Sequence, residues 1–465
     1  MEKAEGKTFK FPNVIIILLC MMLLAMVATW VIPSGEYERV ENSNGQMLVV
    51  PDSYSKTESS PVGLFTVFKA IPEGLTEAGM IAWTILIIGG TWQVLNTTGS
   101  ISMGIEKMLH KLGKREFIII PIMMLIFATI ASFIGALELA IVYVPIMISL
   151  CIALRLDLLT AVAICLVSVG GAFAASLTNP FTVGLGQQIA GLPLYSGILY
   201  RLVVLVTFTV VGILFVLRYV SKIKKNPKNS LVYKENIKFI ESYEEEKHTP
   251  KKYHGYIGLL LIIAFGIIIY GVLKLGWFMF EIGAIFFVVA FVSGLIAKMS
   301  LDDITDNFIK GANSVLLAAL VVGLARGILI IIENGMIIDT IIFGLVNIIE
   351  GLPDGISAVG YLLAQSIFNF LVPSGSGQVL ITMPILSSVS EIVGITQQTT
   401  VLATQLGDGI TNILYPVSGA LMASLAIAKV PYMTWLRFIM PLIVTWTVLG
   451  SIFLVIAQFI QWGPF

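Results

Sequence analysis

The chain has 465 residues, of which 57% are hydrophobic and only 12% are charged, and its 28 basic and 28 acidic residues give a formal net charge of zero. Soluble proteins carry about 25% charged residues, so this composition excludes an ordinary soluble protein. The neutral charge gives no reason to expect a nucleic acid partner. Apolar runs such as Val14 to Ile32 and Gly258 to Leu273 approach the length of a bilayer-spanning helix. The sequence therefore predicts an all-α polytopic protein that contacts the lipid bilayer.

The basic residues indicate how the chain crosses the membrane. We expect a retained first helix within residues 1–35, because its apolar run is too long for the core of a signal peptide. Lys and Arg cluster in four segments: Lys3 to Lys10, Lys107 to Arg115, Arg218 to Lys252 and Lys298 to Lys310. Because cytoplasmic loops are enriched in these residues, the four clusters and the N-terminus are predicted to be cytoplasmic.

Polar segments divide the chain into predicted domains. After the first helix, residues 36–78 are predicted to form an acidic extracytoplasmic loop and an amphipathic arm. The first repeat is expected at 79–217 and a cytoplasmic linker at 218–256. Scaffold helices at 257–298 and a second repeat at 299–465 complete the predicted order.

The two halves share a series of landmarks in the same order. Each has an amphipathic segment before an apolar helix, then a glycine, and then two breaks that are rich in small residues. Asn179 follows Gly99 by 80 positions, and Asn412 follows Gly335 by 77. The helix before Gly99 starts at the acidic outer loop, whereas its counterpart starts beside the basic segment 298–310. We therefore expect two inverted repeats, as in many secondary transporters.

The first break of each half is predicted to be the tip of a re-entrant hairpin. The stretch Pro373-Ser374-Gly375-Ser376-Gly377 is not expected to hold a regular helix. Since open backbone is costly in hydrocarbon, this tip should face a water-filled cavity. Gly135-Ala136-Leu137-Glu138 is the equivalent tip in the first half. Substrate binding is predicted at Gly135, Ala136 and Glu138 and at the five residues Pro373 to Gly377.

The second breaks carry amides, hydroxyls and one acid. Asp408, Thr411 and Asn412 have a spacing that places them on one face of a helix. A carboxylate at membrane depth is costly and by default functional, so Asp408 is predicted to bind Na⁺ or carry a proton. Thr411, Asn179 and Asn412 are further predicted ion ligands, and Thr178, Asn179 and Asn412 are also expected to contact substrate. The alternative is that Asp408 is a structural acid at a helix end.

Arg326 is another charged residue within an apolar run. We slightly favour pairing with an acid over binding of a substrate carboxylate. No metal or other cofactor is expected. Cys20, Cys151 and Cys165 all lie in apolar runs, which favours simple packing over disulfides.

Two motifs at the second breaks carry a family resemblance. They are SLTNPFTVGLGQQIAGLPLYSG at Ser176 to Gly197 and TQLGDGITNILYPVSGALMASLAIAKVPYMTWLRF at Thr404 to Phe438. With them the chain resembles, over nearly its whole length, the YfcC-like branch of the anaerobic four-carbon dicarboxylate carrier family. That branch is similar to arginine–ornithine antiporters of Gram-positive bacteria. The resemblance implies the ion transporter superfamily, with a dimerising scaffold, an elevator-like transport domain, and a place in the bacterial inner membrane.

The first hairpin tip departs from the pattern of that branch. Where the branch has two adjacent acids followed by Thr, this chain has Glu138-Leu139-Ala140. Two carboxylates suit a cationic amino acid, whereas one suits a neutral amino acid or a carboxylate better. The predicted function is symport or antiport of a small amino acid or carboxylate, with exchange of basic amino acids as one version.

Two other classes compete with transport. The helix breaks could form the selectivity filter of an ion channel, although a channel needs a continuous pore. A membrane enzyme is disfavoured, because His110, His248 and His254 lie in or near polar loops and no H-E-x-x-H motif occurs.

Overall fold

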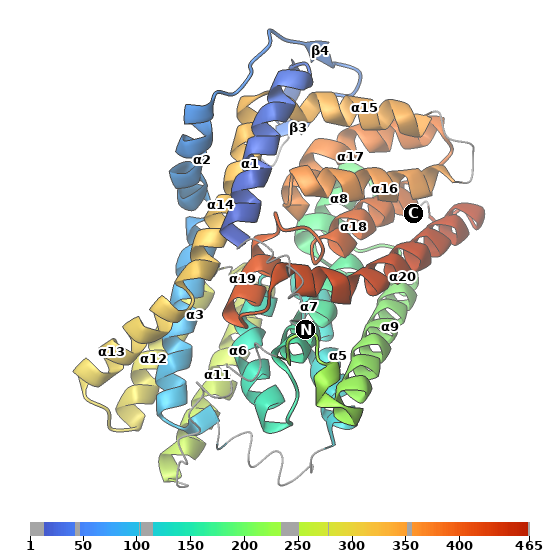
Figure 1. The fold of residues 1–465 in the computed structure, drawn as a ribbon. Coiled ribbons are helices and arrows are strands. Elements are labelled where there is room, and N and C mark those ends of the chain that lie inside the picture. The colour runs from blue at the N-terminus through green and yellow to red at the C-terminus, as the bar shows by residue number, and fades with distance from the viewer. Residues whose placement is uncertain are drawn as a thin grey trace, which may run out of the picture.

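The structure is a computed structural model, which describes residues 14–41, 47–101, 103, 115–233, 251–277, 279–350 and 356–463. Figure 1 shows the helices in two groups, a tall group at the left that includes α2, α3, α13 and α14, and a larger group at the right. We call the whole left group, which is larger than the amphipathic arm predicted within residues 36–78, the arm, and the right group the body. Within the described residues, six helices are long and apolar enough to cross a membrane.

The arm is made of long apolar helices and two amphipathic ones. Its helices are α1 (Val14–Val31), α2 (Leu64–Glu77), α3 (Gly79–Thr97), α11 (Lys252–Leu275), α12 (Met279–Ile296), α13 (Leu301–Ser314) and α14 (Leu316–Asn334). In α2 the buried residues Val67, Ala70 and Gly74 recur at helical spacing on one face. A capping box at Ser300 and Asp303 begins α13. Only Ala78 separates α2 from α3, and only Val315 separates α13 from α14.

Each amphipathic helix packs on the long helix of the other half. The helix α2 lies antiparallel on α14, with Gly74 against Gly323, and α13 lies antiparallel on α3, with Gly311 against Gly89. A Cβ atom on any of these four glycines would come within 3.0 Å of the other helix's backbone. Glycine therefore permits this close approach, and the two pairings are equivalent under exchange of the halves.

The body contains the broken helices. From the first half come α5 (Glu116–Ile134), α6 (Leu139–Ala153), α7 (Leu158–Ala174), the π-helical turn η1 (Pro180–Gly184), α8 (Leu185–Ile189) and α9 (Ile198–Lys225). From the second come α15 (Ile338–Glu350), α16 (Ser357–Leu371), α17 (Gly375–Ile392), α18 (Gln397–Thr411), α19 (Gly419–Ile427) and α20 (Tyr432–Phe459). All residues of α7 are buried, so α7 forms the centre of the body beside α18.

Helices of matching length recur in the two halves. The pairs α1 and α12, α2 and α13, α3 and α14, and α9 and α20 have 18, 14, 19 and 28 residues per helix. Packing recurs as well, since α5 contacts α7 as α16 contacts α18, and α6 contacts α19 as α17 contacts α8. The predicted order of landmarks therefore has a structural counterpart. The correspondence between the halves also includes α1 and α12, which precede the first of these landmarks. The inverted relation of the halves stays a prediction.

A segment of short strands joins the arm to α15. Strand β1 (Gly35–Glu36) pairs antiparallel with β4 (Ser55–Lys56), and β2 (Arg39–Glu41) pairs with β3 (Met47–Val49). Arg39 Nη2 donates to both carboxylate oxygens of Asp339 at 2.9 Å, and the Tyr37 amide donates to Oδ2 at 2.9 Å. The side chain of Asp339 is only 5% exposed, so this ion pair is a well-defined attachment.

One expectation about a helix limit was wrong, and the structure also shows helical turns at both ends of the predicted linker. The glycines Gly375 and Gly377, expected to be irregular, form the first turn of α17. They are helical because Ser374 caps the turn, its Oγ accepting from the Gly377 amide at 3.3 Å. In addition, α9 runs to Lys225, followed by a 3₁₀ turn η2 (Pro227–Asn229), and α11 begins at Lys252. Helices thus enter the expected linker from both ends, because their charged turns extend past the apolar spans.

Candidate functional site

The tip of the first hairpin lies between α5 and α6. Gly135 ends α5 with a positive φ of 68°, and its amide donates to the Ala131 carbonyl at 2.9 Å. A Cβ atom on Gly135 would overlap the side chain of Asn179. Both the backbone conformation and this contact require glycine. Glu138, the last residue before α6, is thereby placed at the end of the tip.

The tip of the second hairpin lies between α16 and α17 and is short. Val372 to Ser374 are its non-helical residues, and Gly375 begins α17. A Cβ atom on Gly375 would lie 3.0 Å from Asp408 Oδ2 and 2.7 Å from Thr182 Cγ2. The second tip therefore touches both second breaks, one from each half of the chain.

Asn179 organises the break between α7 and η1. Its Oδ1 accepts from the amides of Phe181 at 2.9 Å and Thr182 at 3.3 Å. The backbone amide of Asn179 donates to Ser176 Oγ at 3.2 Å, and the Ser176 hydroxyl donates to the Ser132 carbonyl at 2.5 Å. These bonds satisfy backbone groups that the helix break leaves open. A π-helical turn follows, a feature that is frequent at functional sites.

Asp408 organises the break between α18 and α19. It is 1% exposed, and its Oδ1 accepts from Asn412 Nδ2 at 2.8 Å, one helical turn further on. The predicted shared face of Asp408, Thr411 and Asn412 therefore exists. Asn369 of α16 joins this face, because its Nδ2 donates to Thr411 Oγ1 at 2.8 Å and to Asn412 Oδ1 at 3.2 Å.

Four buried polar atoms around the two breaks lack a hydrogen-bond partner among the described residues. They are Asn179 Nδ2, Thr182 Oγ1, Asn369 Oδ1 and Asp408 Oδ2. Each such group costs about 1–3 kcal/mol when it stays unpaired. Three of the four are oxygens, and within the described chain no cationic side chain pairs with Asp408. Oxygen atoms of this kind bind small cations, and the carboxylate also accepts a proton. Either a cation or a proton would neutralise the charge of Asp408.

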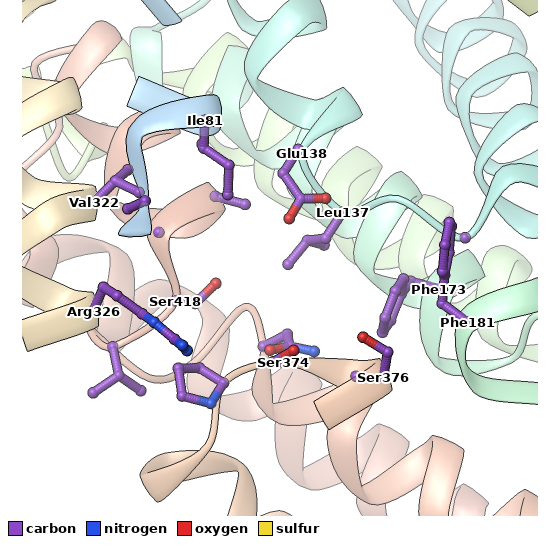
Figure 2. A pocket seen from close by; sticks show the side chains of 18 of the residues that line it. Ile81, Leu137, Glu138, Phe173, Phe181, Val322, Arg326, Ser374, Ser376 and Ser418 are labelled. Carbon is purple, nitrogen blue, oxygen red and sulfur yellow. The ribbon is translucent and has the colours of Figure 1, made fainter. Parts of the chain in front are cut away.

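A cavity of about 360 Å³ opens where the two tips meet the arm. Figure 2 shows side chains from both groups of helices around it. The arm contributes Glu77, Ala78, Ile81, Val322 and Arg326. The body contributes Gly135, Leu137, Glu138, Phe173, Phe181, Thr182, Pro373, Ser374, Gly375, Ser376, Asn412, Val417, Ser418, Gly419 and Ala420. Its size is in the range of small-molecule sites.

Opposite charges face this cavity from the two groups of helices. From the arm, Arg326 Nε donates to Glu77 Oε2 at 2.6 Å, and both side chains remain partly exposed. From the first tip, the Glu138 carboxylate points into the cavity (Figure 2). No ion pair joins Glu138 to another described residue. Arg326 therefore does pair with an acid, and the sequence analysis had not singled out that acid, Glu77.

Most of the predicted site residues converge here. Those that line the cavity are Gly135, Glu138, Pro373, Ser374, Gly375, Ser376, Asn412 and Arg326. Asn179, Asp408 and Thr411 lie behind the tips, and Ala136, Thr178 and Gly377 are absent from the lining. Glu77, Thr182 and Asn369 are site residues that were not predicted from the sequence. Thr182 belongs to the quoted motif at Ser176 to Gly197, and Asn369 is an amide within an apolar run, so both had a visible signal.

The sequence matches known proteins over nearly its full length. Residues 11–459 match the family model described as C4-dicarboxylate anaerobic carrier. An Escherichia coli (strain K12) protein named "Putative basic amino acid antiporter YfcC" is 32% identical over 97% of this chain and 96% of its own. An uncharacterized protein of Haemophilus influenzae is 29% identical over 97% and 98% of the two chains.

Two solved structures also align with the chain. MtrF of Neisseria gonorrhoeae, described as one of a class of antimetabolite efflux pumps, gives a TM-score of 0.43 at 15% identity over 97% of this chain and 96% of its own. The YdaH transporter of Alcanivorax borkumensis gives 0.43 at 14% identity over 97% and 100%.

Proposed function

Because the chain belongs to the C4-dicarboxylate anaerobic carrier family, a family of membrane transporters, we propose that it is a secondary active transporter of a small amino acid or carboxylate. It is a multi-pass membrane protein and not an enzyme. One observation supports the site above all others, namely that both hairpin tips and the Asn412 break line a single cavity. Helix breaks around a cavity are the usual construction of a transporter binding site.

The proposed mechanism is alternating access by movement of the body against the arm. The cavity lies between these two groups, so a relative shift would move it toward one membrane face or the other. The antiparallel packing of α2 on α14 and of α13 on α3 supports two inverted repeats that form a stationary scaffold. An elevator-like shift of the body is the version that this division favours.

The charges of the cavity bear on the proposed substrate. The sequence alone offered one acid, Glu138, whereas the cavity contains a second, Glu77. With Arg326 included, the wall carries two acidic side chains and one basic side chain, which suits a substrate with a cationic group. Exchange of basic amino acids, as in the name of the E. coli relative, is therefore the favoured version.

Asp408 is the proposed site of ion coupling, with Thr411, Asn412 and Asn179 around it. Its buried carboxylate contacts the second tip at Gly375, so occupation by Na⁺ or a proton would directly affect that tip. Coupling between an ion and a substrate requires such a shared element.

We further propose the predicted placement and assembly in the membrane. Figure 1 shows α13 and the basic end of α9 at one end of the molecule and β4 at the other, in line with a cytoplasmic N-terminus and linker. The predicted domain limits at 1–35, 36–78, 79–217, 218–256, 257–298 and 299–465 remain the proposal. We also propose that the protein lies in a bacterial inner membrane and forms a homodimer through the arm.

Counterflow into proteoliposomes tests this function. The purified chain would be assayed with labelled arginine, ornithine, leucine and succinate, with and without Na⁺. We expect saturable exchange of arginine or ornithine, and about a tenfold weaker affinity for them in Glu138→Gln, since a charge-assisted contact is lost. Exchange of only succinate would contradict the basic amino acid assignment. Conductance without concentrative uptake would instead identify the alternative, an ion channel.

A further inference from the structure

Glu77 contacts Arg326 in a way that leaves most of the guanidinium free. The bond uses Nε, at 2.6 Å from Glu77 Oε2. The terminal nitrogens Nη1 and Nη2 make no hydrogen bond to any residue that the structure describes. Figure 2 shows the end of this side chain reaching into the cavity toward Ser374. Four N–H donors in a planar fork are thus presented to whatever occupies the cavity.

The packing of α2 on α14 fixes this orientation. Gly327 follows Arg326, and a Cβ atom on Gly327 would lie 2.8 Å from the Ala70 carbonyl oxygen. The two helices are therefore in close contact at Gly323 and Gly327, on either side of Arg326, and this packing keeps Glu77 near Nε. Glu77 acts on the cavity through Arg326, which makes it a positioning residue.

The opposite wall offers the complementary charge. The Glu138 carboxylate enters from the first hairpin tip, and Ile81, Leu137 and Val322 line the cavity near the two charged groups (Figure 2). A planar fork binds a carboxylate through two parallel hydrogen bonds. A carboxylate such as Glu138 binds an ammonium or guanidinium group. The two walls together fit a molecule that has both groups, joined by an apolar segment.

We propose that Arg326, oriented by Glu77, binds the carboxylate of the substrate, while Glu138 binds its cationic group. The inference rests on the proposed transport function and adds that the carboxylate is required for recognition. An amino acid is accepted, whereas the amine left after its decarboxylation is rejected. The substrate then bridges the arm and the body, because Arg326 belongs to one and Glu138 to the other.

The test compares each amino acid with its decarboxylated amine. Labelled arginine, ornithine and leucine are assayed by counterflow in proteoliposomes of the full chain, with agmatine, putrescine and 3-methylbutylamine as the respective competitors. Unlabelled amino acid is the reference competitor. For the wild type we expect the amine to inhibit about tenfold or more weakly than the amino acid, as loss of a bidentate ionic contact implies.

Variants of Arg326 and Glu77 test which of the two side chains causes the preference for the amino acid over the amine. Arg326→Lys keeps a positive charge but has no fork, so its affinity for the amino acid should fall about tenfold, while that for the amine stays unchanged. Glu77→Ala should lose part of the preference, because the fork is no longer oriented. Glu77→Gln is the matched variant, since its amide oxygen still accepts from Nε. The ratio of amine to amino acid affinity should persist in it, even where the lost charge lowers both affinities. Thermal unfolding of each variant checks that it is folded.

The outcomes separate the two levels of the proposal. An unchanged ratio of amine to amino acid affinity in Arg326→Lys would overturn the carboxylate assignment while leaving transport intact. A wild type that exchanges amino acid and amine equally well would do the same. A wild type that exchanges succinate but none of the amino acids would overturn this inference and leave transport intact. A wild type that exchanges neither would overturn the proposed function as well.

Discussion

Gly375 and Asp408 are in direct contact, although one begins α17 and the other lies within α18. A methyl group added to Gly375 would lie 3.0 Å from Asp408 Oδ2, the carboxylate oxygen that lacks a hydrogen-bond partner among the described residues. The space between the hairpin tip and the buried acid is therefore too small for a methyl group without a shift.

Gly375→Ala should impair transport more than folding. The added methyl would also meet Thr182 Cγ2 at 2.7 Å, so the tip must shift away from Asp408. We expect at least about a tenfold loss of exchange rate, since small displacements at a site are costly. Gly377→Ala is the matched comparison in the same helical turn, because the atom nearest to its Cβ would be the capping Ser374 Oγ at 3.1 Å rather than Thr182 or Asp408. Equal exchange rates in the two variants would contradict this reading.

Asp408→Asn should abolish uptake while the protein still folds. The amide keeps a hydrogen-bonding partner for Asn412 but carries no charge with which to hold Na⁺ or a proton. Uptake would be measured in proteoliposomes beside thermal unfolding of the same preparation. Uptake at the wild-type rate would remove Asp408 from the mechanism and leave it the structural acid of the alternative interpretation.

Gly74→Ala should destabilise the arm. A Cβ atom at this position would overlap the Gly323 carbonyl oxygen and come within 2.7 Å of the Gly327 amide nitrogen. Overpacking of this kind costs about 1–3 kcal/mol. Gly266→Ala on α11 is the control, because beyond its own helical turn no atom of the described residues lies within 4 Å of its Cβ position. The midpoint of thermal unfolding should fall for the first variant and not for the second.

Arg39→Gln should loosen the segment of short strands from α15. The charge-assisted bonds to Asp339 would be lost, at a cost of about 1–2 kcal/mol for a partly exposed arginine. Limited proteolysis should then cut within residues 35–63 faster than in the wild type. Lys56→Gln changes an exposed charge of the same segment and should leave the cleavage rate unaltered. Equal rates for both variants would mean that the ion pair does not hold the segment.

The sequence predicted the features that have a local signal. Long apolar runs identify membrane helices, and Gly135 marks a break because a positive φ there needs glycine. The spacing of Asp408 and Asn412 predicts their shared face, which a 2.8 Å hydrogen bond then joins. Such features depend on residues within a few turns of one another, so they can be read from one segment at a time.

The features that the sequence left open depend on distant partners. Glu77 and Arg326 are 249 positions apart, and nothing near either residue identifies the other. Asn369 has no charge to distinguish it within α16, and its role follows from contacts with α18 about forty residues later. The helical state of Gly375 was mispredicted because the cap from Ser374 outweighs the low helix propensity of glycine.

The crossed packing of the arm also sets the order of events during synthesis. The buried face of α2 fits α14, which leaves the ribosome roughly 250 residues later, a delay on the order of tens of seconds at ordinary translation rates. Until then the glycine face of α2 has no native partner, and neither half of the chain can complete its own arm. Insertion of this protein into the membrane must therefore pass through a long-lived, half-assembled state whose unpaired helices depend on lipid or on the insertion machinery for protection.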